Sequence, residues 1–321
     1  MRLRRRRWGI PTTGNLLHWR KHDTNRRNRE INVLPFRCIR PTRVEEVIGL
    51  LEQHGEAAAL LAGGTDLVVA LRDGKIVPRV VIDLKRTNDL PPVISAVDGW
   101  LTIGATVPLS EIESHEIVRL RFPALAEAAA VVGSIQIRNR ATLVGNICNA
   151  SPAADTVPVL AVYGTVVKVL GPAGERHLPV VDFIKGNRRT ALAPGEIATA
   201  VSIPLPKQPF GAAFARMTRR RGVDLATVNL CCGVNHAGVT TFAFGAVSAR
   251  PLLVRDAEGI LADPRVAEDA KANALDCLIA RASPITDVRA SAEYRRAMLR
   301  VLAQRVQRRA GERLAGEKKH G

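Results

Sequence analysis

Two short stretches combine glycine with small polar residues in a way that suits the binding of a phosphate group. The first is Gly63-Gly64-Thr65-Asp66, which stands between an apolar run and a predicted helix. Adjacent glycines leave no side chain between a ligand and the main chain, and the first N–H groups of a helix point outward as donors to an anion. The pattern is neither G-x-G-x-x-G nor a P-loop, so a purely structural turn stays open as the alternative.

The second stretch is ATLVGNICNASPAADT, residues 141–156. It supplies a hydroxyl, an unobstructed main chain, an amide and a carboxylate, in Thr142, Gly145, Asn146 and Asp155. Two such turns could hold a diphosphate from opposite sides. The alternatives are that Asn146 adopts the left-handed helical conformation and that Asp155 caps the helix that follows it.

No other part of the sequence offers a catalytic constellation. His115 and His177 are the histidines well inside predicted elements, and each is expected at the surface. G-x-S-x-G, H-E-x-x-H and paired carboxylates in an apolar setting are absent, so chemistry by this chain would depend on a bound cofactor. The cysteines show no C-x-x-C spacing, which argues against a disulfide framework or a metal cluster in this chain and fits a reducing cytoplasm; they are Cys38, Cys148, Cys231, Cys232 and Cys277.

A small parallel α/β unit is predicted around the first turn. Apolar residues at helical spacing predict a helix from Arg40, capped by Thr42 and ended by Gly55. Short apolar runs at 57–62 and 79–84 predict strands on either side of a second helix. This order places the adjacent glycines between a strand and a helix N-terminus.

The chain of 321 residues, 46% of them hydrophobic, is long enough for two domains. After a strand at 100–106 and helical segments broken at Pro123, residues 142–206 are predicted to form short antiparallel strands and turns. A proline cluster predicts a domain boundary near 208–211. Further strands and helices then form an α+β domain, whose last helix starts at Ser291 with an apolar face of Tyr294, Met298, Val301, Leu302 and Val306.

Basic charge is concentrated at the two ends of the chain. Of the formal net charge of +17, residues 1–33 contribute ten Lys/Arg against two acids, and residues 289–321 contribute ten against three. The middle is therefore nearly neutral, and a nucleic-acid groove is not predicted. No uncharged apolar run approaches the roughly eighteen residues of a membrane span, and no apolar segment after the basic start indicates an export signal.

Three ordered segments together resemble the FAD-binding medium subunit of the molybdenum hydroxylases, the family of aerobic carbon monoxide dehydrogenase and xanthine dehydrogenase. They are LLAGGTDLVVALRDGKIVPRVVIDL, VGSIQIRNRATLVGNICNASPAADT and FIKGNRRTALAPGEIATAVSIPLP. The resemblance implies an α+β fold: a two-lobed PCMH-type FAD-binding domain, with a small parallel α/β lobe and an antiparallel lobe, at 34–208. A smaller α+β C-terminal domain at 211–311 follows, with a basic, disordered extension at 1–33 and a charged tail at 312–321.

The resemblance also implies the FAD contacts. The family's two diphosphate-binding turns fall on Ala62, Gly63, Gly64, Thr65 and Asp66, and on Thr142, Gly145 and Asn146. Asp155, Leu192 and Arg216 fall on further positions that line the FAD. The sequence departs from the family at Val144, where glycine is frequent, and at Arg216, where lysine is frequent.

The implied role is electron transfer in a heterotrimer or its dimer. A molybdopterin-containing large subunit would oxidise the substrate, and a [2Fe–2S] small subunit would pass electrons to this chain's FAD, then to NAD, a quinone or another acceptor. The absence of cluster-type cysteines agrees with this division. Two alternatives are a stand-alone PCMH-fold flavin oxidoreductase and a non-enzymatic basic protein that binds RNA or an acidic surface through its ends.

Overall fold

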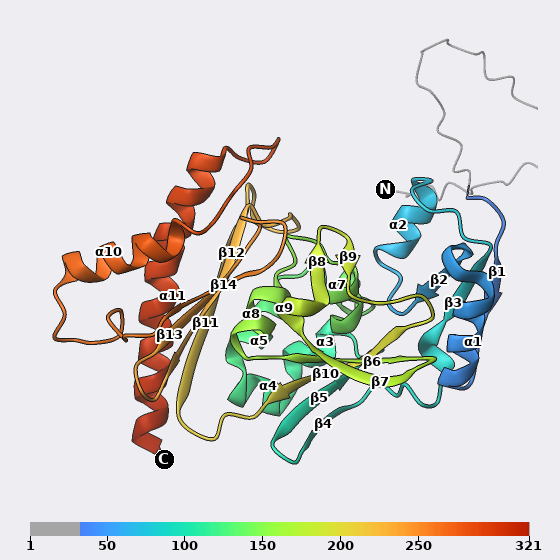
Figure 1. The fold of residues 1–321 in the computed structure, drawn as a ribbon, viewed down its shortest axis with the longest axis horizontal. Helices are drawn as coiled ribbons and strands as arrows, with labels where there is room; N and C mark the ends of the chain where they lie inside the picture. Colours follow the sequence, from blue (N-terminus) through green and yellow to red (C-terminus); the bar gives the residue numbers. More distant parts are fainter. Residues whose placement is uncertain (1–32, 321) are drawn as a thin grey trace, which may run out of the picture. The chain divides into compact units, whose positions relative to one another are not determined.

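The computed structural model describes residues 33–320, so the basic extension expected at 1–33 lies outside the described residues except for Val33. A parallel three-stranded sheet forms the first lobe, in the order β1-β3-β2 (Figure 1). The sequence predicted β2 and β3 of this sheet but not β1. The strands are β1 (Arg37–Ile39), β2 (Ala58–Leu61) and β3 (Val80–Asp83). The small parallel lobe is therefore confirmed, with one strand more than expected.

Helix α1 (Val44–His54) is not capped by the residue that the sequence indicated. The N–H and the hydroxyl of Thr42 both donate to Glu46, whereas the N–H of Val44 donates to Asp89 Oδ2 at 3.0 Å. Asp89 lies 45 residues further along the chain, so no local pattern could have shown this cap. The helix ends as predicted at Gly55, whose φ is +49°.

The rest of the parallel lobe is short. A 3₁₀ turn precedes β2, helix α2 follows the glycine pair, and a second 3₁₀ turn follows β3. These elements are η1 (Gly55–Ala57), α2 (Leu67–Arg72) and η2 (Leu84–Arg86). Side chains of α1 and β3 share one small hydrophobic core, against which Ala62, the first residue of the glycine turn, also packs.

An antiparallel five-stranded sheet forms the second lobe, in the order β4-β5-β10-β6-β7, which confirms the predicted antiparallel unit. Its strands are β4 (Ile94–Val97), β5 (Trp100–Gly104), β6 (Val166–Gly171), β7 (Gly174–Pro179) and β10 (Ile197–Pro204). A separate hairpin consists of β8 (Ile184–Gly186) and β9 (Arg189–Thr190).

Helices fill the connections of this lobe, including the stretch 142–206, for which the sequence predicted strands and turns and, as one alternative, a helix after Asp155, which is α8. Pro123 opens α5, where its missing N–H costs nothing. The Thr142 hydroxyl caps α7, so the second predicted turn is the first turn of a helix. The helices are α3 (Leu109–Ser114), α4 (Glu116–Arg121), α5 (Pro123–Ala130), α6 (Ile135–Arg138), α7 (Leu143–Cys148), α8 (Thr156–Val162) and α9 (Val180–Phe183).

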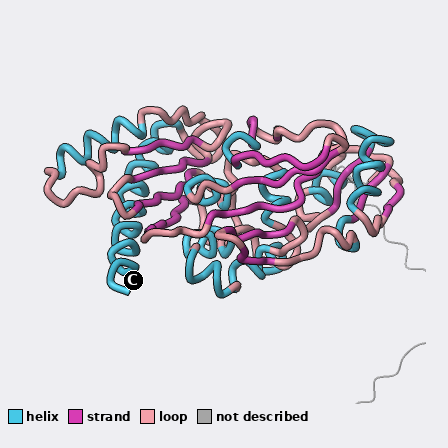
Figure 2. Tube along the Cα trace, turned by 60° about the horizontal axis from the view of Figure 1, so that its bottom comes forward, coloured by secondary structure: helices cyan, strands magenta, loops and turns pink. Residues whose placement is uncertain are grey.

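The C-terminal domain is a four-stranded antiparallel sheet between two helical layers (Figure 1). One face packs on α5 and α8 of the preceding domain. The other packs on the long helix α11, which ends at the C-terminus beside the strands in Figure 2. Successive side chains of a strand alternate between the faces, so Cys231 and Cys232 belong to two different cores. The elements are β11 (Phe210–Met217), β12 (Val228–Asn235), β13 (Thr240–Gly245), β14 (Leu252–Asp256), α10 (Glu268–Ile279) and α11 (Ala292–His320).

The predicted apolar face of α11 is confirmed in part, since Leu302 and Val306 are buried and Met298 packs against the same core, but its first residue is wrong. Tyr294 is 46% exposed, whereas Arg295 is only 2% exposed because its guanidinium donates to two main-chain carbonyls and to Asp287. The segment expected as a charged tail continues α11 to His320. The face that does pack is Leu299, Leu302, Ala303, Val306, Ala310 and Leu314. Within residues 33–320, no helix has the length and apolar character needed to cross a membrane.

The two domains are joined by a cluster of charges as well as by apolar packing. Glu127 of α5 accepts hydrogen bonds from Arg309, at 2.6 Å, and from Arg313, both on α11. The same arginines donate to the carbonyls of Phe214 and Ala212 on β11. These contacts hold β11 and its neighbours against helix α5 of the preceding domain, and the far end of β11 reaches the site described next.

Candidate functional site

A cavity of about 630 Å³ opens between the parallel lobe, helix α7 and the far end of β11. Its volume falls in the range of small-molecule and cofactor sites, roughly 300–1,000 Å³. The structure brings all eleven predicted site residues to its lining: Ala62, Gly63, Gly64, Thr65, Asp66, Thr142, Gly145, Asn146, Asp155, Leu192 and Arg216. Residues up to 154 positions apart in the sequence therefore meet around one space.

The first turn touches the chain just before the second turn. A Cβ at Gly63 would lie 2.1 Å from the carbonyl oxygen of Arg140 and 2.8 Å from the Cα of Ala141. Both neighbours are main-chain atoms, so no larger residue fits without moving the backbone. Gly64 has φ +79°, which also favours glycine. Gly63 and Gly64 are therefore required by the fold, and the same two residues can also line a ligand site, so the structural and functional interpretations do not exclude each other.

The second turn is the N-terminus of a helix. Thr142 Oγ1 accepts a hydrogen bond from the N–H of Gly145 at 3.0 Å, and a Cβ at Gly145 would lie only 2.8 Å from that oxygen. Val144 is helical and buried, and its φ is not positive, so a β-branched residue is compatible with the backbone there. Of the family's two glycines, only the one at 145 is required by this geometry.

Asn146 is held by a side chain and not by a left-handed backbone. Its Oδ1 accepts a hydrogen bond from Thr156 Oγ1 at 2.7 Å, and its φ is not positive, so the conformational alternative is wrong. With the oxygen engaged, the amide N–H groups are the part of the side chain that can donate into the cavity. This position therefore supplies a donor suited to an anion.

Asp155 occupies the N-cap position of α8, but its carboxylate does not cap the helix. Oδ2 accepts from Arg216 Nη1 at 2.7 Å, and Oδ1 accepts from Asn229 Nδ2 at 2.9 Å. Burial raises the pKa of Asp155, and the hydrogen bond from Asn229 and the charge of Arg216 oppose that rise. Both partners are on the C-terminal domain, so that domain completes the site.

Several lining residues were not predicted as site residues. Arg188, at φ +54°, donates to Asn149 Oδ1 at 2.9 Å across the cavity edge, and Cys148 also faces the cavity. Burial raises the pKa of the Cys148 thiol to about 12, so it is protonated at neutral pH. The loop after β11 adds Asp224 and Leu225. No local sequence signal marks these positions, because the fold alone brings them to the cavity.

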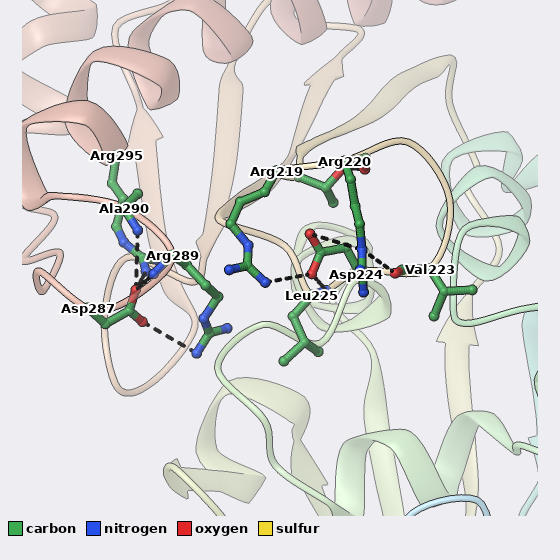
Figure 3. A network of polar contacts seen from close by, with 10 residues as sticks. Arg219, Arg220, Val223, Asp224, Leu225, Asp287, Arg289, Ala290 and Arg295 are labelled. Carbon is green, nitrogen blue, oxygen red and sulfur yellow. Dashed lines mark hydrogen bonds and ion pairs between the residues drawn. The ribbon is translucent and has the colours of Figure 1, made fainter.

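The loop after β11 is organised by ion pairs. Figure 3 shows Arg219 and Arg220 pointing toward Asp224, with Arg219 Nη2 at 3.3 Å from Asp224 Oδ1. In the same view, Arg289 and the buried Arg295 both pair with Asp287. Arg219 and Arg220 are largely exposed, and their pairs with Asp224 lie within the loop after β11, whereas Asp287 and Arg289 belong to the segment before α11.

The histidines singled out in the sequence lie away from the cavity lining. His177 pairs with Glu175 at 2.6 Å on the exposed strand β7, as expected for a surface residue. His115 is only half-exposed, with a buried Nδ1. Among residues 33–320, no group of three or more metal-ligating side chains is found, and the five cysteines are free thiols.

Comparison with protein families assigns both domains. The model described as the FAD binding domain in molybdopterin dehydrogenase matches residues 34–206, more than half of the chain. This chain belongs to that family of FAD-binding subunits. The model described as the CO dehydrogenase flavoprotein C-terminal domain matches residues 212–310 of this FAD subunit.

Named relatives match most of this FAD subunit. The nicotinate dehydrogenase FAD-subunit of Eubacterium barkeri is 34% identical over 70% of this chain and 79% of its own. The carbon monoxide dehydrogenase medium chain of Hydrogenophaga pseudoflava is 31% identical over 86% of this chain and 96% of its own. The chain is thus a FAD-dependent oxidoreductase component, the medium subunit type of the molybdenum hydroxylases.

Solved structures show the same fold. A chain of Cu,Mo-CO dehydrogenase has a TM-score of 0.80 and 28% identity, and the match covers 87% of this chain and 98% of that one. Quinoline 2-oxidoreductase from Pseudomonas putida 86 has a TM-score of 0.79, 27% identity and the same coverage. The two-lobed FAD-binding domain followed by a smaller α+β domain is therefore the family architecture.

The cavity suits the cofactor of this family. Two helix N-termini and a glycine-lined turn offer main-chain donors to a diphosphate. Apolar side chains such as Ile137 and Leu192 provide walls for a planar ring, and Asp155 and Asn146 supply an acceptor and a donor. The donor set thus fits FAD on its own chemistry, without reference to the relatives.

Proposed function

We propose that this chain transfers electrons from the [2Fe–2S] clusters of a partner subunit, through its FAD, to NAD, a quinone or another acceptor. The observation that carries the proposal is the cavity in which the two predicted turns and the Asp155–Arg216 pair meet. When bound, FAD supplies the ability to accept electrons singly and to release them in pairs. The protein's contribution is to bind and orient it.

The residues of the lining would divide this work by their chemistry. The main chain of 62–66 and the N–H groups after Thr142 would hold the diphosphate, and Asn146 Nδ2 would donate to it. Asp155 would accept a hydrogen bond from the cofactor while Arg216 balances its charge. Leu192 would contribute apolar contact, so eleven residues from both domains form the proposed FAD contacts.

The proposed assembly contains a molybdopterin-containing large subunit and a [2Fe–2S] small subunit, as a heterotrimer or its dimer. Several relatives are named as one subunit or one chain of a dehydrogenase, which supports a division of labour between chains. We also propose domain limits of 34–208 and 211–311 and a cytoplasmic location. Nucleic acid is not a proposed partner, because the basic charge lies at the chain ends and not at the cavity.

The test is purification of the chain from cells that produce it alone and with its two candidate partners. We expect a yellow protein that releases FAD on denaturation, and a complex in which substrate reduces the flavin. Stopped-flow spectroscopy with NAD, a quinone or dioxygen would then identify the acceptor. A folded, colourless chain that takes up no added FAD would contradict the proposal.

A further inference from the structure

Asn229 is a fully buried amide at the boundary between the domains. It lies on β12 directly opposite Arg216 of β11, so two neighbouring strands reach the same carboxylate. Asn229 Nδ2 donates to Asp155 Oδ1 at 2.9 Å and to the carbonyl of Ala153 at 3.4 Å. The amide therefore holds both the side chain and the main chain of the loop that forms this cavity wall.

The fold leaves a confined space for this amide. Gly245 faces Asn229 on β13, and a Cβ at Gly245 would lie 2.0 Å from Asn229 Oδ1. That oxygen is buried and has no hydrogen-bond partner. Because an unpaired buried polar atom is unfavourable, packing alone would favour an apolar side chain here. The amide's donor, and not its packing, accounts for its presence.

The partner of this donor is a buried acid that faces the cavity. Asp155 is 6% exposed, and burial favours its protonated form. Without Asn229, one carboxylate oxygen would lose its donor, the protonated form would be favoured further, and the side chain would be free to rotate. The charge and the direction of Asp155 at the cavity therefore depend on a residue that does not itself line the cavity.

We propose that Asn229 is a positioning residue of the FAD site, which holds the Asp155 carboxylate in the orientation that the cofactor meets. This inference rests on the proposed role of Asp155 as a FAD contact. It makes the C-terminal domain a determinant of FAD affinity through a side chain behind the cavity wall.

The test measures the dissociation constant of FAD, by flavin fluorescence, for the full chain stripped of flavin. Asn229→Leu keeps the approximate volume but removes the donor, and loss of a hydrogen bond to a charged group is expected to weaken FAD binding about 10- to 100-fold. Gly245→Ala should weaken it in the same direction by displacing the amide. Thr240→Val is the matched control, because Thr240 is a fully buried polar residue of the same sheet whose hydroxyl has no hydrogen-bond partner.

A pH series separates positioning from general damage to the fold. In Asn229→Asp, the new carboxyl would lie against the Asp155 carboxylate. The charged groups nearby are Arg216, which pairs with Asp155, and the buried Arg295, which binds the carbonyl of Thr227 on the segment just before β12. Two adjacent carboxylates share a proton more readily as pH falls, and the protonated carboxyl can then donate. FAD affinity, relative to the unaltered chain, should therefore recover between about pH 8 and pH 6.

The outcomes are distinct. If Asn229→Leu and Gly245→Ala fold and bind FAD as tightly as the unaltered chain, with the same flavin spectrum, the inference is wrong and FAD binding itself stands. If the unaltered chain takes up no FAD, the proposed function fails instead. Should Asn229→Leu not fold, a flat pH series for Asn229→Asp overturns the inference, and a rising affinity at lower pH supports it.

Discussion

The two domains contribute to the cavity in different ways. The FAD-binding domain presents mostly main chain: a glycine pair pressed against residues 140–141, and a helix N-terminus capped by Thr142. The C-terminal domain presents side chains, because Arg216 and Asn229 reach across the boundary to one carboxylate. The first contribution depends on the absence of bulky side chains at the glycines. The second depends on the register of β11 and β12, which places Arg216 opposite Asn229.

This contrast means that the two halves should fail differently. A substitution in the main-chain half introduces atoms where none fit, and its effect should not depend on pH. A substitution in the side-chain half removes a partner from a titratable group, and its effect should change with pH. The following predictions test each half and the joint between them.

The largest effect is expected for Gly63→Ala. The new methyl group would overlap main-chain atoms of Arg140 and Ala141, which cannot rotate away. We expect a loss of about 3 kcal/mol or more in the free energy of unfolding and loss of measurable FAD binding. Urea unfolding and flavin content check this. Gly49→Ala is the control, since Gly49 lies in helix α1 with no neighbouring atom within 4 Å. This substitution should raise the free energy of unfolding by about 0.5–1 kcal/mol.

The next effect is expected for Arg216→Met. Asp155 would keep its burial and lose its cation, so we expect a loss of about 2 to 3 kcal/mol near pH 8. Removing the cation raises the folded-state pKa of Asp155 further above its unfolded value. The folded state then binds the proton more tightly, and stability should rise as pH falls from 8 toward 5.

The same comparison has a conservative control. Arg216→Lys keeps the charge with a different reach, so it should retain most of the stability and show a weaker pH dependence than Arg216→Met. Thermal unfolding at a series of pH values measures both. If Arg216→Met were as stable as the unaltered chain at every pH, Asp155 would not need this partner.

A smaller effect is expected for Glu127→Gln, which tests the joint between the domains. Two arginines of α11 would lose their shared carboxylate, and the partly exposed geometry suggests a loss of about 1 to 2 kcal/mol. Denaturant unfolding of the full chain checks this value. The exposed pair Arg308–Glu312 supplies the control, since Glu312→Gln should change stability by less than about 0.5 kcal/mol.

The smallest effect on stability is expected for Thr142→Val, which removes the acceptor for the Gly145 N–H. Loss of a helix cap costs about 1 kcal/mol, and FAD affinity should fall as well because the cap lies in the cavity wall. Ser291→Ala removes a comparable contact, to the N–H of Tyr294 in the first turn of α11. That control should lose similar stability and keep FAD affinity.

The main-chain half of the cavity was the part that local sequence could indicate. Gly63 and Gly64 stand together between an apolar strand and a helix, and the reason is steric and local, so their types carry the information. The second turn was recognised from Thr142, Gly145 and Asn146, although the sequence did not show that it begins a helix. Its six-residue helix is too short for a periodic apolar pattern to be evident.

Contacts between distant residues were beyond the reach of local patterns. Asp89 caps α1 from 45 residues away, and Asn229 meets Asp155 across 74 residues. At the start of α11, periodicity predicts Tyr294 on the apolar face, but Arg295 is the buried residue, and the carbonyls that its guanidinium binds lie in distant segments. The strands and helices around the first turn were mostly predicted, whereas β1 and the helices α7 and α9 were not, and the long-range partners of all elements are set by the fold.

By itself, the sequence determined most of the two lobes and the glycine turns, because propensity, periodicity and small-residue spacing act over a few neighbours. The resemblance to FAD-binding medium subunits came from three ordered motifs and not from those patterns. Tertiary structure alone decided which domain holds Asp155, which residues close the cavity and which carbonyls the buried Arg295 meets. Those contacts depend on strand register and on packing between segments far apart in the chain. In such contacts the energy of a polar group is set by its burial and its partner, and not by its neighbours in sequence.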